Sequence, residues 1–364
     1  MTSFKLSRWN FRIFLCPAAV LLFASGTAQA AFPCVTNGDE LQTALTSAKT
    51  KASPYEIHLT ASATPYQLGP GNDFLYLPND MKIVGGYASG CGSRVEDASN
   101  TIIDFGGYSI GIFPDDDGAT ERLEIDSVTF RHGAGWAARR GAVGDFSDTT
   151  GYIIMHDVRF TDFVNDGDIA PVGMYVVKGT MQLVDVQFDH IHQNTSDPCA
   201  VHVYSDNDTS FTGNFITADL PNGKDFCFDA SNEGGTFNVR VDNSIIWGSD
   251  NFGPDFATIH GLDSTNNGHP LNVSTHNVIS HAFIGYGTAA APVAQISADP
   301  HWKNPAAGDY TLADIGSPAV NSGAIGALGV PYYDINHAMR SVGSHPDRGA
   351  HESPFDDSPV LIVK

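Results

Sequence analysis

The sequence predicts an all-β fold, a right-handed parallel β-helix, from three observations. Six segments between Leu123 and Ser280 repeat one another with a period of roughly 29 residues. Each segment alternates apolar and polar residues, which is typical of β-strands. Runs of helix-forming residues are missing between the segments, which argues against helical and leucine-rich repeats. Strand-and-turn units of this length are typical of stacked β-helix coils, and a β-sandwich with coincidental spacing is the alternative.

The repeats align two columns of residues. The clearest copies are LEIDSVTF (123–130), IIMHDVRF (153–160) and MQLVDVQF (181–188), and weaker copies lie at 210–216, 237–246 and 272–279. The first column holds Val128, Val158, Val186, Asn214, Asn243 and Asn277, and the second holds Phe130, Phe160, Phe188, Ile216, Ile245 and Ile279. We expect the second column to be a buried ladder stacked in sequence order, with coils about 4.8 Å apart. The asparagines predict a buried ladder of side-chain amides.

The segment 1–30 is typical of a signal peptide. Lys5, Arg8 and Arg12 precede the apolar run IFLCPAAVLLFA, and the small residues AQA (28–30) follow it. This order predicts cleavage after about Ala30 and export to the periplasm or out of the cell. No later stretch is long and apolar enough for a membrane helix.

The chain is strongly acidic. It has 41 Asp and Glu against 19 Lys and Arg, a net charge of −22. Removal of the segment 1–30, which holds three basic and no acidic side chains, would leave a net charge of −25. This balance argues against nucleic acid and anionic membranes as partners. It also argues against an acidic polysaccharide, unless calcium or a local basic patch intervenes.

Four cysteines follow the predicted signal peptide. An even number of cysteines in an exported chain predicts disulfides, and four free thiols are the alternative. Cys199 and Cys227 are separated by about one repeat, so adjacent coils would bring them within bridging distance. Cys34 and Cys91 then remain to tie the N-terminal cap to the first coils.

The two ends of the solenoid carry different patterns. An amphipathic helix is predicted over 39–49, capped by Asn37 or Asp39, with one apolar face formed by Leu41, Ala44, Leu45 and Ala48. It would cover the open N-terminal end of the solenoid. Strands are expected at 55–60, 81–87 and 101–105. From 290 onward proline and glycine increase, so 290–352 is predicted to be a last irregular coil with a C-terminal cap, and 353–364 a short tail.

Several of these segments resemble a known family. The segments are FPCVTNGDELQTAL, IVGGYASGCGSR followed by TIIDFGG, and the closing GDYTL, SPAVNSG and DRGAHE. They resemble secreted bacterial right-handed parallel β-helix proteins of the choice-of-anchor-type group in the pectate-lyase-like superfamily. The resemblance spans nearly all of 31–352 and implies a fold more than a function, because the motifs are structural. Asn321 stands where the family usually has Asp, and Arg348 where it usually has Ile. No sorting signal follows, so a released or periplasmic protein is expected.

One functional hypothesis is a polysaccharide lyase. A lyase needs a base to remove the proton next to a uronate carboxylate and a cation to stabilise the resulting charge. The repeat register places Arg131 and Asp189 in one outward column and His132, Asp162 and His190 in another, and Lys178 would enter from the turn before the third copy. The candidate catalytic set takes Arg131, His132, Lys178, Asp189 and His190 from these positions. A solvated face with ordinary salt bridges is the alternative.

Calcium is the one cofactor that the sequence suggests. Three Asp-rich turns could supply oxygen ligands, through Asp115 and Asp117, Asp166 and Asp168, and Asp206 and Asp208. None of them matches an EF-hand loop, and plain solvated turns are the alternative.

Two functions therefore remain open from the sequence. The first is an exported protein that binds extracellular carbohydrate or serves at the cell surface, through aromatic residues such as Tyr152, Tyr175, Tyr204 and Trp247. The second is a calcium-assisted lyase acting on uronate-containing polysaccharide by β-elimination. We favour binding, because no complete catalytic set can be named. The expected partner is a polysaccharide or glycan bound by a monomer, without nucleic acid and without membrane insertion.

Overall fold

The structure of the protein is a computed structural model. It describes residues 32–48, 50, 54–69, 74–77, 80–108, 111–114, 120–134, 150–165, 170–176, 178–193, 199–205, 207–220, 225–230, 235–248, 256–258, 271–280, 283–284, 288–289, 293–325, 330–340 and 344–355. The predicted signal peptide lies outside these residues. The chain from Phe32 onward forms one compact unit.

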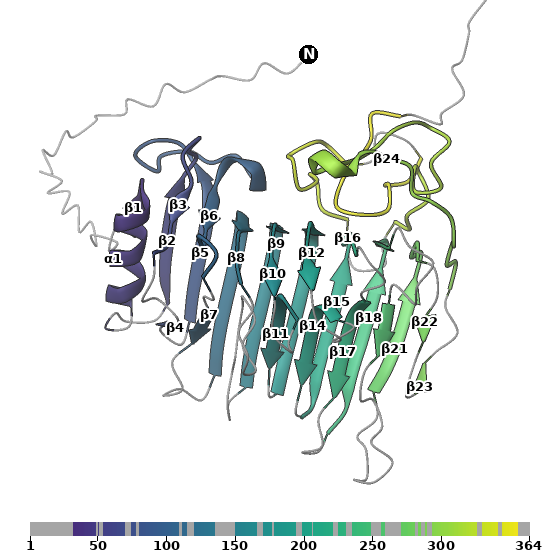
Figure 1. Cartoon of the computed structure of the whole chain (residues 1–364), viewed down its shortest axis with the longest axis horizontal. Helices are drawn as coiled ribbons and strands as arrows, with labels where there is room; N and C mark the ends of the chain where they lie inside the picture. The colour runs from purple at the N-terminus through teal and green to yellow at the C-terminus, as the bar shows by residue number, and fades with distance from the viewer. Residues whose placement is uncertain are drawn as a thin grey trace, which may run out of the picture. The chain divides into compact units, whose positions relative to one another are not determined.

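The structure confirms the predicted parallel β-helix, a solenoid of about five turns (Figure 1). The largest sheet has the order β1 (Cys34–Val35), β2 (Tyr55–Thr60), β5 (Asp80–Tyr87), β8 (Thr120–Arg131), β9 (Thr150–Thr161), β12 (Lys178–Asp189), β15 (Thr209–Asn214), β18 (Phe237–Asp242), β21 (Leu271–His276) and β23 (Thr288–Ala289). Four shorter strands extend it sideways: β3 (Tyr66–Gln67), β6 (Ile102–Asp104), β16 (Thr217–Asp219) and β19 (Ile245–Trp247).

A second parallel sheet forms another side of the coils. It consists of β11 (Val172–Val176), β14 (Cys199–Ser205), β17 (Asp225–Ala230), β20 (Phe256–Thr258) and β22 (Phe283–Ile284). The remaining elements are small: the pairs β4 (Phe74–Leu77) with β7 (Gly111–Pro114), β10 (Val164–Asn165) with β13 (His192–Gln193) and β24 (Trp302–Asn304) with β25 (Asp309–Leu312), and the 3-10 turns η1 (Ala98–Asn100) and η3 (Pro305–Ala307).

A column of left-handed residues bends each coil. Residues with φ between 48° and 57° occupy the same place in successive coils, and we call them the corner column: Ser127, Asp157, Asp185, Phe215, Asn243 and Asn277. Asp and Asn tolerate this conformation better than most residues, which accounts for four of the six. The strand residues after the bend form what we call the second face, built from β6, the ends of β8, β9 and β12, and then β16 and β19.

The interior ladder is confirmed for its first three members. The rings of Phe130, Phe160 and Phe188 are buried and stack at centroid distances of 5.3 and 5.2 Å. The predicted continuation through Ile216 and Ile245 is wrong, because Phe188 pairs with Ala218, and Ala218 pairs with Ile246.

The error has a physical reason. Ile245 and Ile279 are buried, but on the outer side of the second face, where they pack against Leu312 and Ala319. Residues on both sides of this part of the sheet are therefore apolar, and the apolar pattern no longer distinguishes inside from outside. The first predicted column is displaced as well, since Asn243 belongs to the corner column. Its amide donates to Asn214 Oδ1 at 3.1 Å, which retains one step of the predicted amide ladder.

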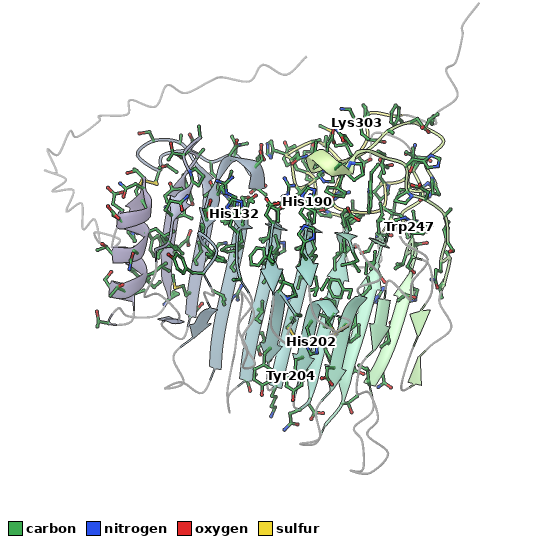
Figure 2. All side chains as sticks on the ribbon, viewed as in Figure 1. His132, His190, His202, Tyr204, Trp247 and Lys303 are labelled. Carbon is green, nitrogen blue, oxygen red and sulfur yellow. A yellow bond between two sulfur atoms is a disulfide. The ribbon has the colours of Figure 1, made fainter. Side chains whose placement is uncertain are left out.

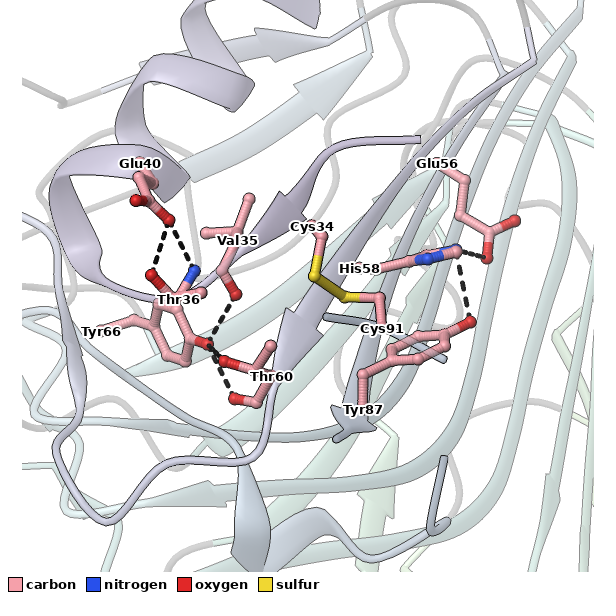
Figure 3. The surroundings of a disulfide bond; sticks show 10 residues. All are labelled: Cys34, Val35, Thr36, Glu40, Glu56, His58, Thr60, Tyr66, Tyr87 and Cys91. Carbon is pink, nitrogen blue, oxygen red and sulfur yellow. Dashed lines mark hydrogen bonds and ion pairs between the residues drawn. A yellow bond between two sulfur atoms is a disulfide. The ribbon is translucent and has the colours of Figure 1, made fainter. Parts of the chain in front are cut away.

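The N-terminal helix α1 (Gly38–Ala48) begins one residue earlier than predicted. Its four predicted apolar residues are all buried. Asn37 Oδ1 accepts the Glu40 amide at 3.0 Å, while Glu40 Oε2 accepts the Thr36 amide at 2.7 Å, so both side chains fix the helix start. Figure 3 shows the Glu40–Thr36 contact beside the disulfide.

Both predicted disulfides are confirmed. Cys34 in β1 is bonded to Cys91, with the Cα atoms 5.8 Å apart, and ties the segment before α1 to the loop after β5 (Figure 3). Cys199 in β14 is bonded to Cys227 in the neighbouring strand β17, with the Cα atoms 5.6 Å apart. No helix among the described residues is long and apolar enough to span a bilayer.

The predicted C-terminal cap lies along the second face. We call the described residues from 298 to 355 the C-terminal segment. The last coil is present, since Ile296 pairs with Ile279. The chain then returns over earlier coils (Figure 1), where Tyr310 Oη donates to Asp219 at 2.7 Å and the Ala350 amide donates to Thr217 Oγ1 at 2.8 Å. The closing motifs noted in the sequence thus attach this segment to the sheet.

Replacing Phe160 by Ala should lower the free energy of unfolding by about 3–5 kcal/mol, because it leaves a cavity between two stacked rings. Denaturant titration monitored by circular dichroism measures this. Tyr332→Ala, at a side chain 67% exposed, is the control and should change stability by less than about 0.5 kcal/mol. Equal effects of the two substitutions would contradict the assigned interior.

Candidate functional site

Polar residues end four neighbouring strands of the second face. Asp104, Arg131, Thr161 and Asp189 are in register at the ends of β6, β8, β9 and β12. His132, Asp162 and His190 follow directly, each with φ between 50° and 58°. The positions of the two predicted columns are therefore aligned, Arg131 with Asp189 in one, and His132 with Asp162 and His190 in the other. We call these seven residues the strand-end row, and Figure 2 shows where its two histidines lie.

The first half of the row is organised by Asp104. Arg131 Nε donates to Asp104 Oδ2 at 2.8 Å, and His132 Nδ1 lies 3.0 Å from the same oxygen. Burial alone would raise the pKa of Asp104, but hydrogen bonds from the Gly106 amide and Arg131 hold it below its usual value. The Arg131 guanidinium and the His132 ring are therefore both held by one ionised carboxylate.

The second half is organised by Asp189, whose side chain is 0% exposed. Arg159 donates to it from Nε at 2.7 Å and from Nη2 at 2.8 Å, and Thr161 and Gln187 each donate at 2.6 Å. His190 Nδ1 lies 3.0 Å away. Burial would raise the pKa of Asp189, but these donors, His190 and Arg159 foremost, lower it to about 2. Asp189 is thus a fixed anion that positions its neighbours and does not reach the surface.

A chain of hydrogen bonds continues from Asp189 into the C-terminal segment. Gln187 uses its amide nitrogen on Asp189, so its Oε1 must accept, and His351 Nε2 lies 2.5 Å from it. His351 Nδ1 then accepts from Asn336 Nδ2 at 3.1 Å. Burial lowers the pKa of His351 to about 4, so its ring is neutral at neutral pH, as this order of donors requires.

A cavity of about 210 Å³ lies between the second face and the C-terminal segment. Its lining includes Ala98 and Ser99 of η1, Arg159 and Gln187 of the sheet, and 307–310, Ile335, Asn336 and His351. Both Arg159 and Asn336 line the cavity and are held through other atoms, while Arg159 Nη1 and Asn336 Oδ1 have no hydrogen-bond partner among the described residues. The two side chains can therefore supply a donor and an acceptor to a ligand.

Lys178 does not join the other four predicted catalytic residues. It is the first residue of β12, whereas Asp189 is the last, so the whole length of the strand separates them. The turn before a strand lies at the opposite end from the strand's last residue, which the sequence interpretation overlooked. The predicted catalytic set is therefore only partly assembled.

The predicted calcium ligands fall mostly outside the described residues, namely Asp115, Asp117, Asp166, Asp168 and Asp206. Asp208 is described and exposed, and its carboxylate accepts the Thr236 amide at 2.8 Å. This contact joins the turns of two adjacent coils. Within the described ranges, no three His, Cys, Asp or Glu side chains are grouped so that they could hold a metal ion.

Two of the four predicted aromatic residues come together. Tyr175 of β11 and Tyr204 of β14 are in register, with ring centroids 4.9 Å apart. Tyr152 lies on a different sheet, in β9, and Trp247 packs against the apolar cluster beneath the C-terminal segment. His202 stands beside Tyr204, well away from His132 and His190 (Figure 2).

The predicted catalytic set does not include Arg159, Gln187 or His351. For the first two a signal existed, because each directly precedes a phenylalanine of the interior ladder and so must point outward from the same row. His351 gave no such signal, because its contact with Gln187 joins two positions far apart in the sequence.

Neither a protein-family model nor a curated protein matches this chain. The solenoid fold therefore rests on the structure, and the resemblance to the choice-of-anchor-type group remains an expectation.

Charged residues of the corner column meet the C-terminal segment. Arg340 contacts Asp185 and lies 4.0 Å above the Phe215 ring. Burial raises the pKa of Asp185 to about 7, against the attraction of Arg340. Asp157, one coil earlier, contacts no described cation, and burial together with Asp185 and Asp126 raises its pKa to about 9.

Asp157→Asn should stabilise the protein above neutral pH. The folded state keeps the Asp157 proton up to about pH 9, whereas the unfolded carboxyl loses it near pH 4. The contribution of Asp157 to the free energy of unfolding therefore decreases as the pH rises through this window. Because Asn cannot ionise and tolerates a left-handed backbone, the substitution should raise stability at pH 8 by at least about 1 kcal/mol.

Thermal unfolding between pH 5 and pH 9 measures this effect. The matched control is Asp162→Asn, which makes the same change at the same backbone conformation but at a side chain 48% exposed. A wild-type pH profile that Asp157→Asn leaves unchanged would show that Asp157 is ionised in the folded protein.

Proposed function

We propose that the protein is exported and binds carbohydrate in the cavity between the second face and the C-terminal segment. The observation that carries this proposal is Arg159, whose guanidinium is clamped by buried Asp189 and leaves Nη1 without a described partner beside the cavity. A donor held in place by two hydrogen bonds loses little freedom when it binds a ligand.

The chemistry of the walls favours a neutral sugar. Asn336 adds an acceptor, while the apolar residues Ala98 and Ile335 are only 2% and 1% exposed, so the accessible groups of the lining are mainly polar. The hydroxyl groups of a sugar would therefore find partners there. The negative charge of Asp189 offsets the positive charge of Arg159, and the net charge of −22 disfavours an acidic polysaccharide. At about 210 Å³ the cavity is smaller than the sites of drug-sized ligands, roughly 300 Å³ or more, which suits one sugar unit.

Export is supported by two observations. Two disulfides join strands and loops of the solenoid, and disulfides persist mainly in oxidising compartments. The segment 1–30 has the order of charged, apolar and small residues that a signal peptide requires.

A calcium-assisted lyase remains the second hypothesis, and its set of residues is less favourable. Asp189 is buried and ionised, and its hydrogen bond to His190 raises the pKa of that ring, so that less of it is in the neutral form that could accept a proton at neutral pH. Lys178 lies at the other end of β12. A base would have to come from His132 or from residues outside the set.

Isothermal titration calorimetry of the exported protein with neutral and uronate-containing oligosaccharides measures the dissociation constants that test the proposal. Arg159→Gln and Asn336→Ala should each weaken binding of a neutral oligosaccharide by about 10-fold, the effect of losing one hydrogen bond of about 1.4 kcal/mol. Arg240→Gln is the matched control, because Arg240 also pairs with a buried aspartate, Asp242, at 2.7 Å but does not line the cavity.

Binding that is equally strong in both cavity variants would place the glycan elsewhere, and no binding to any oligosaccharide would overturn the proposal. Unsaturated sugar ends released in the presence of calcium would favour the lyase hypothesis instead.

A further inference from the structure

We propose a second site, for an organic ammonium cation, on the outer side of the sheet formed by β11, β14 and β17. Its parts are the rings of Tyr175 and Tyr204 and the carboxylate of Asp229. No residue of this site lines the cavity beside Arg159.

The register aligns these three residues on successive rungs. Tyr175 pairs with Tyr204, and Tyr204 pairs with Asp229. Their strand neighbours Val203 and Phe228 point into the core, so the three side chains point outward. The two tyrosine rings are 4.9 Å apart and tilted by 42°, and each is partly exposed. The two aromatic rings and the carboxylate therefore lie side by side on adjacent strands.

Asp229 is incompletely paired among the described residues. Its side chain is only 10% exposed, and its Oδ1 has no hydrogen-bond partner among the described residues. His202 Nε2 has no hydrogen-bond partner in the described part of the chain, and it lies 3.6 Å from Asp229 Oδ2, within ion-pair range but too far for a hydrogen bond. Because Oδ1 is enclosed, a ligand can approach Asp229 only through the exposed 10% of its side chain. The incompletely compensated negative charge of Asp229 therefore favours a cation above it, on the outer side of the sheet.

The surroundings define the class of that cation. Tyrosine faces attract cations within about 6 Å of the ring centre, and the attraction increases where water is excluded. An ammonium group adds N–H donors and a positive charge for Asp229. A metal ion fits less well, because aromatic rings are not its ligands and no suitable group of His, Cys, Asp or Glu exists in the described part of the chain. The acidic chain, with a net charge of −22, would also draw cations toward it.

The test compares glucosamine with N-acetylglucosamine, which have the same sugar ring but differ in the charge at nitrogen. Titration monitored by NMR, with the intact disulfide-bonded protein, should show glucosamine binding about 10-fold or more tightly than N-acetylglucosamine. Tetramethylammonium should also bind, because cation–π attraction needs no N–H donor.

Two pairs of variants locate the site. Asp229→Asn should reduce glucosamine binding to the level of N-acetylglucosamine, whereas Asp314→Asn, which removes the same charge from a side chain 61% exposed, should not. Tyr204→Ala should weaken binding of both cations, whereas Tyr152→Ala should not. Circular dichroism confirms that each variant is folded.

The outcomes separate this site from the cavity. Equal affinity for glucosamine and N-acetylglucosamine, or glucosamine binding that Asp229→Asn leaves intact, overturns the proposal. Loss of glucosamine binding in Asp229→Asn with unchanged binding of a neutral oligosaccharide supports two independent sites, and Arg159→Gln should give the reverse pattern.

Discussion

The bend at the corner column is the constraint on which the other features depend. Six residues at the same place in successive coils adopt a left-handed backbone, and each bend separates the first part of a coil from its second face. Because the bend recurs in register, the residues that follow it also recur in register. The strand-end row exists for this reason, since Arg131, Thr161 and Asp189 are all reached a fixed number of residues after the turn, and Asp104 pairs with the first of them.

The C-terminal segment contacts this same corner column. Arg340 contacts Asp185 and Phe215, and the Gly349 amide donates to the Asn243 carbonyl at 2.8 Å. A residue in this conformation interrupts the regular pairing of its strand and leaves polar groups available to a second chain segment. The segment supplies these partners and, by crossing several coils, forms one wall of the cavity beside Arg159.

The sequence was sufficient for the fold and for part of the site. Periodicity located the phenylalanine ladder, the Cys199–Cys227 disulfide and the four clustered residues of the strand-end row, while helix amphipathicity located the N-terminal cap. Periodicity failed where both faces of the sheet carry buried apolar residues, at Ile245 and Ile279 beneath the C-terminal segment. It also failed for the cavity, because its walls combine η1, the second face and residues beyond 305, and no period relates these parts of the chain.

Charge compensation distinguishes the two proposed sites within one acidic protein. Beside the cavity the buried carboxylates have their donors, since Asp189 holds Arg159 and Asp219 accepts from Tyr310. That surface therefore presents hydrogen-bonding groups with little net charge, which suits a neutral ligand. On the outer side of β14 and β17 the balance is different, because Asp229 keeps an oxygen without a described donor next to aromatic faces. The same solenoid thus offers one compensated and one uncompensated carboxylate, and the charge of the ligand that each can accept follows from that difference.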